Sequence, residues 1–127
     1  MQGKHLFEYA VIRIVPRVER EEFLNVGVIL YCKDQKFLQA VYTLDEDKLR
    51  MLAPGTDLNE VKAYLCAFEL ICKGGKEGGP IALLEPALRF RWLTATRSTV
   101  LQTSKVHGGF SGNAADTLQR LHAQLVL

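Results

Sequence analysis

The sequence predicts an α+β fold in which helices pack against a small, mainly antiparallel β-sheet. Three stretches rich in β-branched and aromatic residues come first along the chain, and amphipathic helical patterns follow them. The four-residue link KDQK separates the second and third stretches, which favours an antiparallel hairpin. Consecutive strands followed by segregated helices are typical of the α+β class.

The first three strands are expected over residues 7–15, 23–32 and 36–43, in one sheet. Pro16 ends the first of them. Both alternating faces of this first strand are apolar, so we expect a central strand that is covered on both sides. A fourth strand is expected over residues 98–103.

Two helices are expected after the third strand. Asp45 opens a short helix with an acidic first turn. Asp57 and Glu60 have the spacing of a capping box and begin a longer helix. Apolar residues recur in this longer helix at intervals of three and four, which predicts one buried stripe: Leu58, Val61, Leu65, Phe68 and Cys72.

The last third of the chain predicts two more helices and a loop. Pro86 suits the first turn of a short helix in which Leu88, Trp92 and Leu93 recur at helical spacing. The segment KVHGGFSG is expected to be a glycine-rich loop. Asn113 caps a terminal helix, whose expected buried stripe is Ala114, Leu118, Leu121 and Leu125.

Length and composition predict one globular domain over residues 1–127. The formal net charge is only +2, from 16 basic and 14 acidic residues, which disfavours a dedicated duplex-DNA binder. Glu8 and Arg13 interrupt the first apolar run, so it does not resemble a secretory signal, and no stretch is long enough for a membrane span. We therefore expect a cytoplasmic protein that does not bind membranes.

The polar residues disfavour most kinds of catalytic or metal-binding site. Cys32, Cys66 and Cys72 each lie in an apolar pattern and are expected to be reduced and largely buried. No Cys/His spacing indicates a metal site, and no motif indicates a cofactor. Serines lie near His107, but the chain has no Gly-x-Ser-x-Gly elbow. The sequence thus contains no complete catalytic constellation.

The stretch FRWLTATRSTVLQTSKVHGG is the strongest candidate for a site. No acidic residue occurs between Pro86 and Ala115. Arg97, Ser98 and Thr99 precede the expected fourth strand, where backbone N–H groups and hydroxyls can converge on an anion. His107 would be a second donor, and Gly108 would leave room for the ligand. On the alternative interpretation, Arg97 pairs with a core carboxylate and His107 caps a turn.

Arg13 and Asn25 form a second candidate pair. Both lie inside expected strands among apolar neighbours, and a buried arginine needs a partner. They could bond each other, Glu22 or a ligand.

Three segments closely resemble a small bacterial family catalogued as domain of unknown function 3037: YAVIRIVPRVEREEFLNVGVILYC, GGPIALLEPALRFRWL and RSTVLQTSKVHGG. The family's two signatures fall here on Arg13, Pro16, Phe23, Asn25 and Gly27, and on Arg97, Ser98, Thr99, Gln102, His107 and Gly109. Members of the family have prolines where Thr96, Thr103 and Lys105 stand here, which predicts a more flexible loop in this chain. The resemblance brings no established activity with it. The family's genomic setting implies a HipA-like kinase as partner.

The leading hypothesis is a non-catalytic accessory or interaction module that binds a protein. The first alternative is a ligand sensor or enzyme that uses Arg97 and His107 on a phosphate-bearing small molecule. The second is single-stranded nucleic-acid binding through Trp92, Phe90 and the neighbouring arginines.

Overall fold

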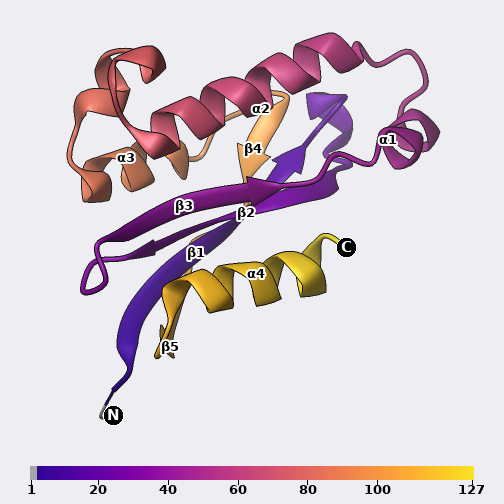
Figure 1. Cartoon of the computed structure of the whole chain (residues 1–127). Coiled ribbons are helices and arrows are strands. Elements are labelled where there is room, and N and C mark those ends of the chain that lie inside the picture. Colours follow the sequence, from indigo (N-terminus) through magenta and orange to yellow (C-terminus); the bar gives the residue numbers. More distant parts are fainter. Residues whose placement is uncertain (1–2) are drawn as a thin grey trace.

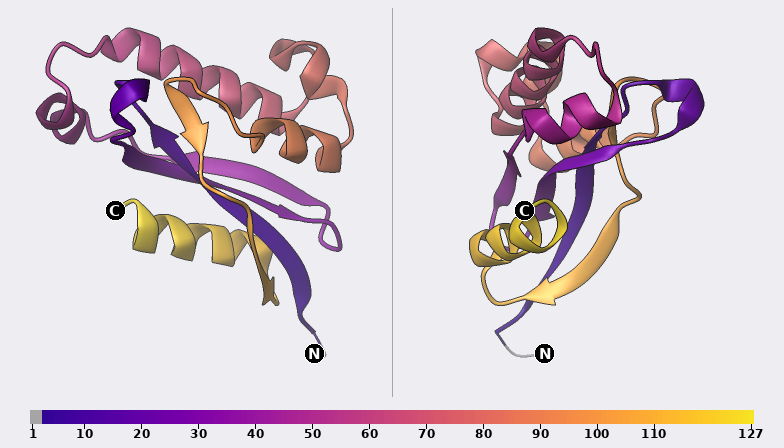
Figure 2. Two further views of the ribbon diagram at one scale, coloured as in Figure 1. Left: turned by 180° about the vertical axis from the view of Figure 1, so that it is seen from behind. Right: turned by 90° about the vertical axis from the view of Figure 1, so that its right-hand side faces the viewer.

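A five-stranded antiparallel sheet with helices on both faces forms the molecule (Figures 1 and 2). The structure, a computed structural model, describes residues 3–127, so the first two residues of the expected domain lie outside it. The strands run in the order β3-β2-β1-β4, and β5 also pairs with β1. Their bounds are His5–Ile14 (β1), Leu24–Cys32 (β2), Phe37–Tyr42 (β3), Leu101–Thr103 (β4) and His107–Ser111 (β5). The predicted α+β class is confirmed.

The helices are divided between the two faces of the sheet. The helix bounds are Glu46–Leu52 (α1), Leu58–Lys73 (α2), Pro86–Leu93 (α3) and Ala114–Leu125 (α4), with short 3-10 turns at Val18–Arg20, Lys76–Gly78 and Pro80–Leu83. Figure 1 shows α1, α2 and α3 above the sheet and α4 below it. None of the helices in residues 3–127 is long and apolar enough to cross a membrane.

Side-chain caps fix where three helices begin. The carboxylate of Asp45 accepts a hydrogen bond from the Lys48 N–H, and that of Asp57 accepts from the N–H groups of Asn59 and Glu60. Asn113 caps α4 in the same way. Each cap satisfies an N–H that has no partner inside its helix, a contribution of about 1 kcal/mol. The predicted helix starts are therefore confirmed.

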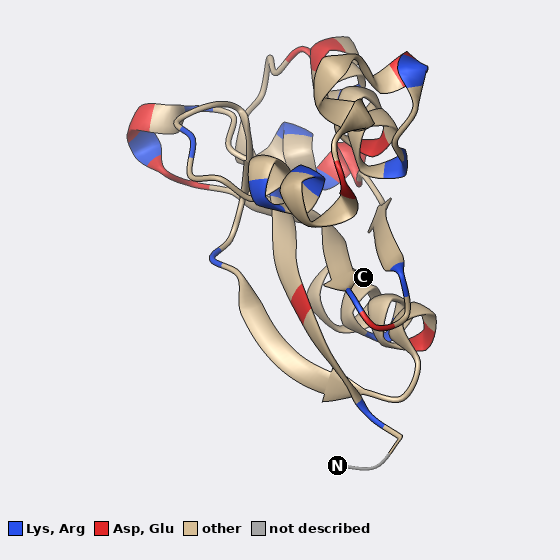
Figure 3. Ribbon diagram, turned by 90° about the vertical axis from the view of Figure 1, so that its left-hand side faces the viewer, with Lys and Arg blue, Asp and Glu red and all other residues tan. Residues whose placement is uncertain are grey.

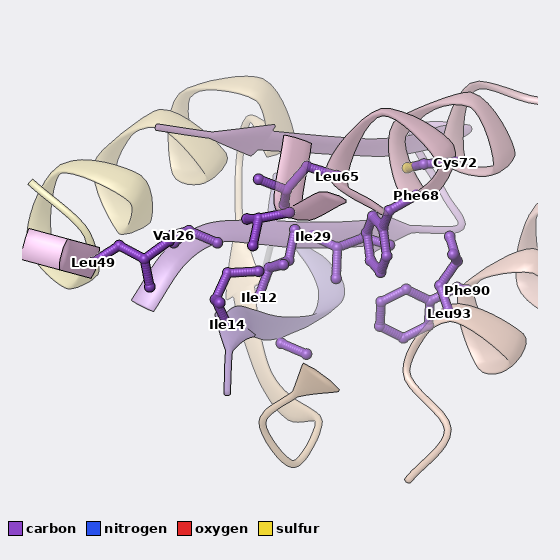
Figure 4. Packing of buried hydrophobic residues seen from close by; sticks show 12 residues of the cluster. Ile12, Ile14, Val26, Ile29, Leu49, Leu65, Phe68, Cys72, Phe90 and Leu93 are labelled. Carbon is purple, nitrogen blue, oxygen red and sulfur yellow. The ribbon is translucent and has the colours of Figure 1, made fainter. Parts of the chain in front are cut away.

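β1 is the central strand, and both of its faces are buried. Ile12 and Ile14 pack on the α2 side, in a cluster with Leu65 and Phe68 (Figure 4). Phe7 packs on the α4 side with residues of β2 and α4. The prediction of a strand covered on both sides is correct, because alternating residues of β1 supply one apolar row to each cluster.

A bulge in β2 interrupts its pairing with β1. Ile12 lies opposite Gly27 and Arg13 lies opposite Asn25, so Val26 is the extra residue. A Cβ atom on Gly27 would lie 2.5 Å from the carbonyl oxygen of Val41, so only glycine fits at this position. The bulge keeps Arg13 and Asn25 side by side on the α4 side of the sheet.

The segment KVHGGFSG is not the expected loop, because residues 107–111 form β5 against the first half of β1. The pairing is made by backbone N–H and C=O groups, which every residue has. A strand that contains two glycines therefore shows little of the side-chain pattern that predicts strands. Gly109 has a packing role, since a Cβ there would lie 2.8 Å from the ring of Phe7. The expected fourth strand is shorter than predicted, as only residues 101–103 pair with β1.

Of the three α3 residues that recur at helical spacing, Leu93 is buried, together with Phe90, whereas Leu88 and Trp92 are exposed. The helix is only eight residues long, so its spacing does not decide which of these residues face the core. One burial prediction, that all three cysteines are largely buried, was wrong. Cys66 lies on the exposed side of α2, while the other two cysteines are buried; all three are free thiols.

Candidate functional site

Arg97 lies in the segment that joins α3 to β4. Its guanidinium carbon is 4.2 Å from the centre of the Trp92 ring, and Nη2 donates a hydrogen bond to the Trp92 carbonyl oxygen. Among residues 3–127 no carboxylate forms an ion pair with it. The alternative interpretation from the sequence, in which Arg97 pairs with a core carboxylate, is therefore wrong for the described structure. The arginine is held on the surface by an aromatic face and a carbonyl.

A hollow of about 280 Å³ opens beside this arginine, between α2, α3 and the segment before β4. Arg97 is the one charged residue in its lining. The walls are otherwise apolar or aromatic apart from one threonine, and they are formed by Tyr64, Ala67, Phe68, Ile71, Trp92, Leu93, Thr99, Val100 and Leu101. We call this set of residues, with Arg97, the α2–α3 hollow.

Two aromatic side chains at the hollow combine an apolar ring with a polar group. Trp92 is 40% exposed and Tyr64 is 41% exposed. The Tyr64 hydroxyl donates a 2.5 Å hydrogen bond to the carboxylate of Glu60, and this bond raises the pKa of Tyr64. Tyr64 is therefore neutral and held in place one turn from Glu60, with its ring available to a ligand.

The remaining polar groups of this segment are largely used within it. The Thr99 hydroxyl donates to the carbonyl of Leu101, and the Gln102 amide donates to the carbonyl of Thr99, each at 2.8 Å. The Thr94 hydroxyl donates to the Phe90 carbonyl, also at 2.8 Å. Ser98 is exposed and makes no side-chain hydrogen bond in the described structure. The segment therefore offers Arg97 and Ser98 to a ligand, while the hydroxyls of Thr94 and Thr99 stabilise the turn.

His107 and Gly108 lie elsewhere. His107 is opposite Tyr9 in the sheet, and their ring centres are 5.4 Å apart. Tyr9 packs in the cluster on the α4 side, whereas Arg97 lines a hollow on the α2 side. Gly108 lies on β5 opposite Glu8. The structure therefore does not bring His107 and Gly108 together with Arg97, and the expected convergence of the three is not met.

Arg13 and Asn25 are neighbours on the α4 side. The Arg13 guanidinium stacks 4.0 Å above the ring of Phe23, and its Nε is buried without a hydrogen-bond partner. The Asn25 side-chain amide donates to the Leu125 carbonyl at 3.3 Å, while its buried Oδ1 has no partner. Glu22 pairs with Arg20 instead. The sequence suggested that Arg13 and Asn25 bond each other, Glu22 or a ligand. In the described structure they bond neither each other nor Glu22. A ligand at this pair remains a proposal.

Ser104 and Cys72 are buried and engaged in the fold. Ser104 is buried between β4 and β5, where its hydroxyl accepts from the Val11 N–H and donates to the Lys105 carbonyl. Burial raises the pKa of the Cys72 thiol to about 12. Such a thiol is protonated at neutral pH and is a poor nucleophile. Within residues 3–127, no group of three or more His, Cys, Asp or Glu side chains could hold a metal ion.

Sequence reasoning missed the contribution of α2 to the site. It placed the basic stretch correctly next to Trp92 but gave no role to Tyr64 and Ile71. Both residues are apolar positions of α2 that lie outside its buried stripe. An exposed tyrosine beside an otherwise regular stripe was the available signal.

The sequence profile of a family described as "Protein of unknown function (DUF3037)" matches residues 9–126. The chain belongs to this family. The resemblance noted from the sequence is thereby confirmed. No match was found among curated proteins or among solved structures. The DUF3037 match includes all residues of the α2–α3 hollow and both members of the Arg13–Asn25 pair.

Proposed function

We propose that this DUF3037 chain is a non-catalytic interaction module, and that its α2–α3 hollow receives an apolar side chain of a partner protein. A carboxylate next to that side chain would pair with Arg97. One observation carries the proposal: a single cation, stacked on a tryptophan, stands beside an otherwise apolar hollow. Tryptophan, tyrosine and arginine are the residues most enriched in the energetic centres of protein interfaces.

The lining of the hollow favours an apolar side chain over a phosphate-bearing molecule. Sites for small molecules usually present several convergent polar groups. The hollow has one charged residue among otherwise apolar or aromatic walls and one threonine. His107, the second donor that an anion sensor would use, packs on Tyr9 across the sheet. The geometry therefore supports the sensor or enzyme alternative less well than the module.

Single-stranded nucleic acid is also less well supported. A stacking platform needs exposed rings, and Phe90 is fully buried. Arg91 is paired with Glu8 by two hydrogen bonds, of 2.9 and 2.7 Å. One face of Trp92 is covered by Arg97. Of the residues expected to bind bases, Phe90 and Arg91 are thus committed within the protein, which leaves Trp92 without a second exposed ring beside it in α3.

The kinase setting that the family resemblance implies makes a HipA-like kinase the first partner to test. The tagged chain, expressed in its native cells, would be purified with bound proteins, which mass spectrometry would identify. Trp92→Ala and Arg97→Ala would be compared with two controls of the same residue classes outside the hollow, Leu83→Ala and Arg20→Ala. We expect a stoichiometric partner with the wild-type chain and with both controls, and its loss with both hollow variants.

Two results would contradict the proposal. Recovery of the same partner with Trp92→Ala and Arg97→Ala would place the interface elsewhere. Recovery of no protein, together with a small molecule that copurifies with the wild-type chain, would favour the sensor. Circular dichroism of each variant checks that any lost binding does not come from unfolding.

A further inference from the structure

β5 forms the outer edge of the sheet, remote from the α2–α3 hollow. It pairs with β1 on one side only. Its five residues, HGGFS, include no lysine, arginine, aspartate or glutamate, and Figure 3 shows this strand without any charged residue. Natural sheets usually protect such an edge with charges, proline, a bulge or a covering element. Within β5 itself no charge or proline is present.

An apolar pair stands beside this edge. Leu6 and Phe110 lie directly opposite each other on β1 and β5, and they are 56% and 58% exposed. Two large apolar side chains left in contact with water next to an unpaired edge indicate a surface that another strand covers.

The opposite edge of the sheet, β3, also has no charge or proline among its six residues, FLQAVY. Helices α2 and α4 pack against it, and only Gln39 among its residues is exposed. Of the two edges, β5 is therefore the one that leaves large apolar side chains exposed to water.

We infer that two copies of this chain pair through β5, antiparallel and about a two-fold axis at Gly109, so that their sheets join into one. This inference does not depend on the proposed function. In this register Phe110 of one copy lies opposite Gly108 of the second. The two-fold axis creates the same pair again, with Gly108 of the first copy opposite Phe110 of the second. His107 lies opposite Ser111 of the second copy. A large side chain thus faces a glycine at both symmetric positions, and the ring can cover the bare glycine backbone.

Steric space and charge both fit this register. A Cβ atom on Gly108 would meet only the Phe7 carbonyl oxygen, 3.6 Å away, so the face of the sheet above Gly108 has room for a neighbouring ring. Antiparallel pairing brings the start of β5, which follows Lys105, next to the end of β5 in the second copy, which leads into the first turn of α4 with its Asp116. No like charges face each other along β5.

The test is the molar mass of the purified chain, measured by light scattering over a range of concentrations. We expect a dimer for the wild-type chain. Gly108→Lys and Phe110→Lys should each weaken it about 100-fold, since a tenfold effect at one pair is repeated by the axis. Leu83→Lys, an equally exposed apolar position on another surface, should leave the dimer unchanged.

The register itself is tested by a double variant. Gly108→Glu combined with Phe110→Lys places opposite charges at both cross-strand pairs, so the dimer should return relative to either lysine variant. Thermal unfolding of each variant confirms that it is folded. A wild-type chain that stays monomeric up to about 1 mM, the weak end of ordinary association, would overturn the inference. A dimer that survives both lysine substitutions would do so as well.

Discussion

Replacing Arg97 by alanine should cost less stability than the loss of a buried ion-pair partner would, while removing most of the partner binding. The side chain makes two contacts in the structure, the stacking on Trp92 and the hydrogen bond to the Trp92 carbonyl. An exposed cation–π contact contributes about 0.5–1 kcal/mol, and a hydrogen bond contributes about 0.5–1.5 kcal/mol net. The expected loss in the free energy of unfolding is therefore about 1–2.5 kcal/mol. Removal of one partner from a buried ion pair would cost about 3–5 kcal/mol.

Urea unfolding followed by far-ultraviolet circular dichroism measures this difference. Fluorescence is a poor probe here, because Trp92 is the only tryptophan and lies directly under Arg97. For a chain of this length the loss corresponds to a fall in Tm of roughly 3–12 °C. Arg20→Ala, which removes an exposed arginine paired with Glu22, serves as the control. A loss above about 3 kcal/mol for Arg97→Ala would refute the reasoning, since it would show a buried structural role.

Three further predictions concern the core and its titrating groups. Phe90→Ala should cost about 3–5 kcal/mol in urea unfolding and Leu88→Ala less than about 0.5, because only Phe90 is buried, stacked on Tyr31; the reverse order would contradict the packing of α3. Burial lowers the pKa of His122, so the unfolded chain takes up the proton first, and the free energy of unfolding should fall as the pH drops below about 6.5. His122→Gln should lose that part of the pH dependence, and an unchanged profile would rule out the buried neutral histidine. In the native protein Cys66 alone should react rapidly with a thiol reagent, and after unfolding all three thiols should react. Two rapidly reacting thiols in the native protein would mean that Cys32 or Cys72 is accessible.

The parts of the fold that follow from local rules could be predicted from the sequence. Two apolar faces on β1 indicated a central strand, and Asp57 and Asn113 indicated where their helices begin. These features depend on residues within one element, so periodicity and capping chemistry are enough to find them.

The relative placement of Arg97 and His107 could not be predicted in this way. β4 pairs with β1 so that Leu101 lies opposite Ile14, and β5 pairs so that His107 lies opposite Tyr9. The two registers differ by one residue, because the chain is irregular between them around Ser104. An uninterrupted strand would put Leu101 and His107 on the same face, but one extra residue reverses the face. Nothing in the sequence marks that residue.

Only one side of the α2–α3 hollow could be predicted from the sequence, for a related reason. The basic stretch and Trp92 stand close together in the sequence, and both contribute to the hollow. Tyr64 and Ile71 come from α2, 28 and 21 residues before Trp92, and only the packing of α2 beside α3 brings them to Trp92. A site shared between elements is a property of tertiary packing, which a single sequence does not display.

Hydroxyl-radical footprinting of the chain, free and bound to the partner protein recovered with it, tests the central claim most directly. Side-chain oxidation reports exposure to water at each residue. Trp92 and Tyr64 should become protected in the complex, because both line the hollow and are about two-fifths exposed in the free chain. Met51, 85% exposed on α1, should be oxidised as before. Unchanged oxidation of Trp92 and Tyr64, with protection of Phe23 beside Arg13 instead, would contradict the account and place the partner on the α4 side of the sheet.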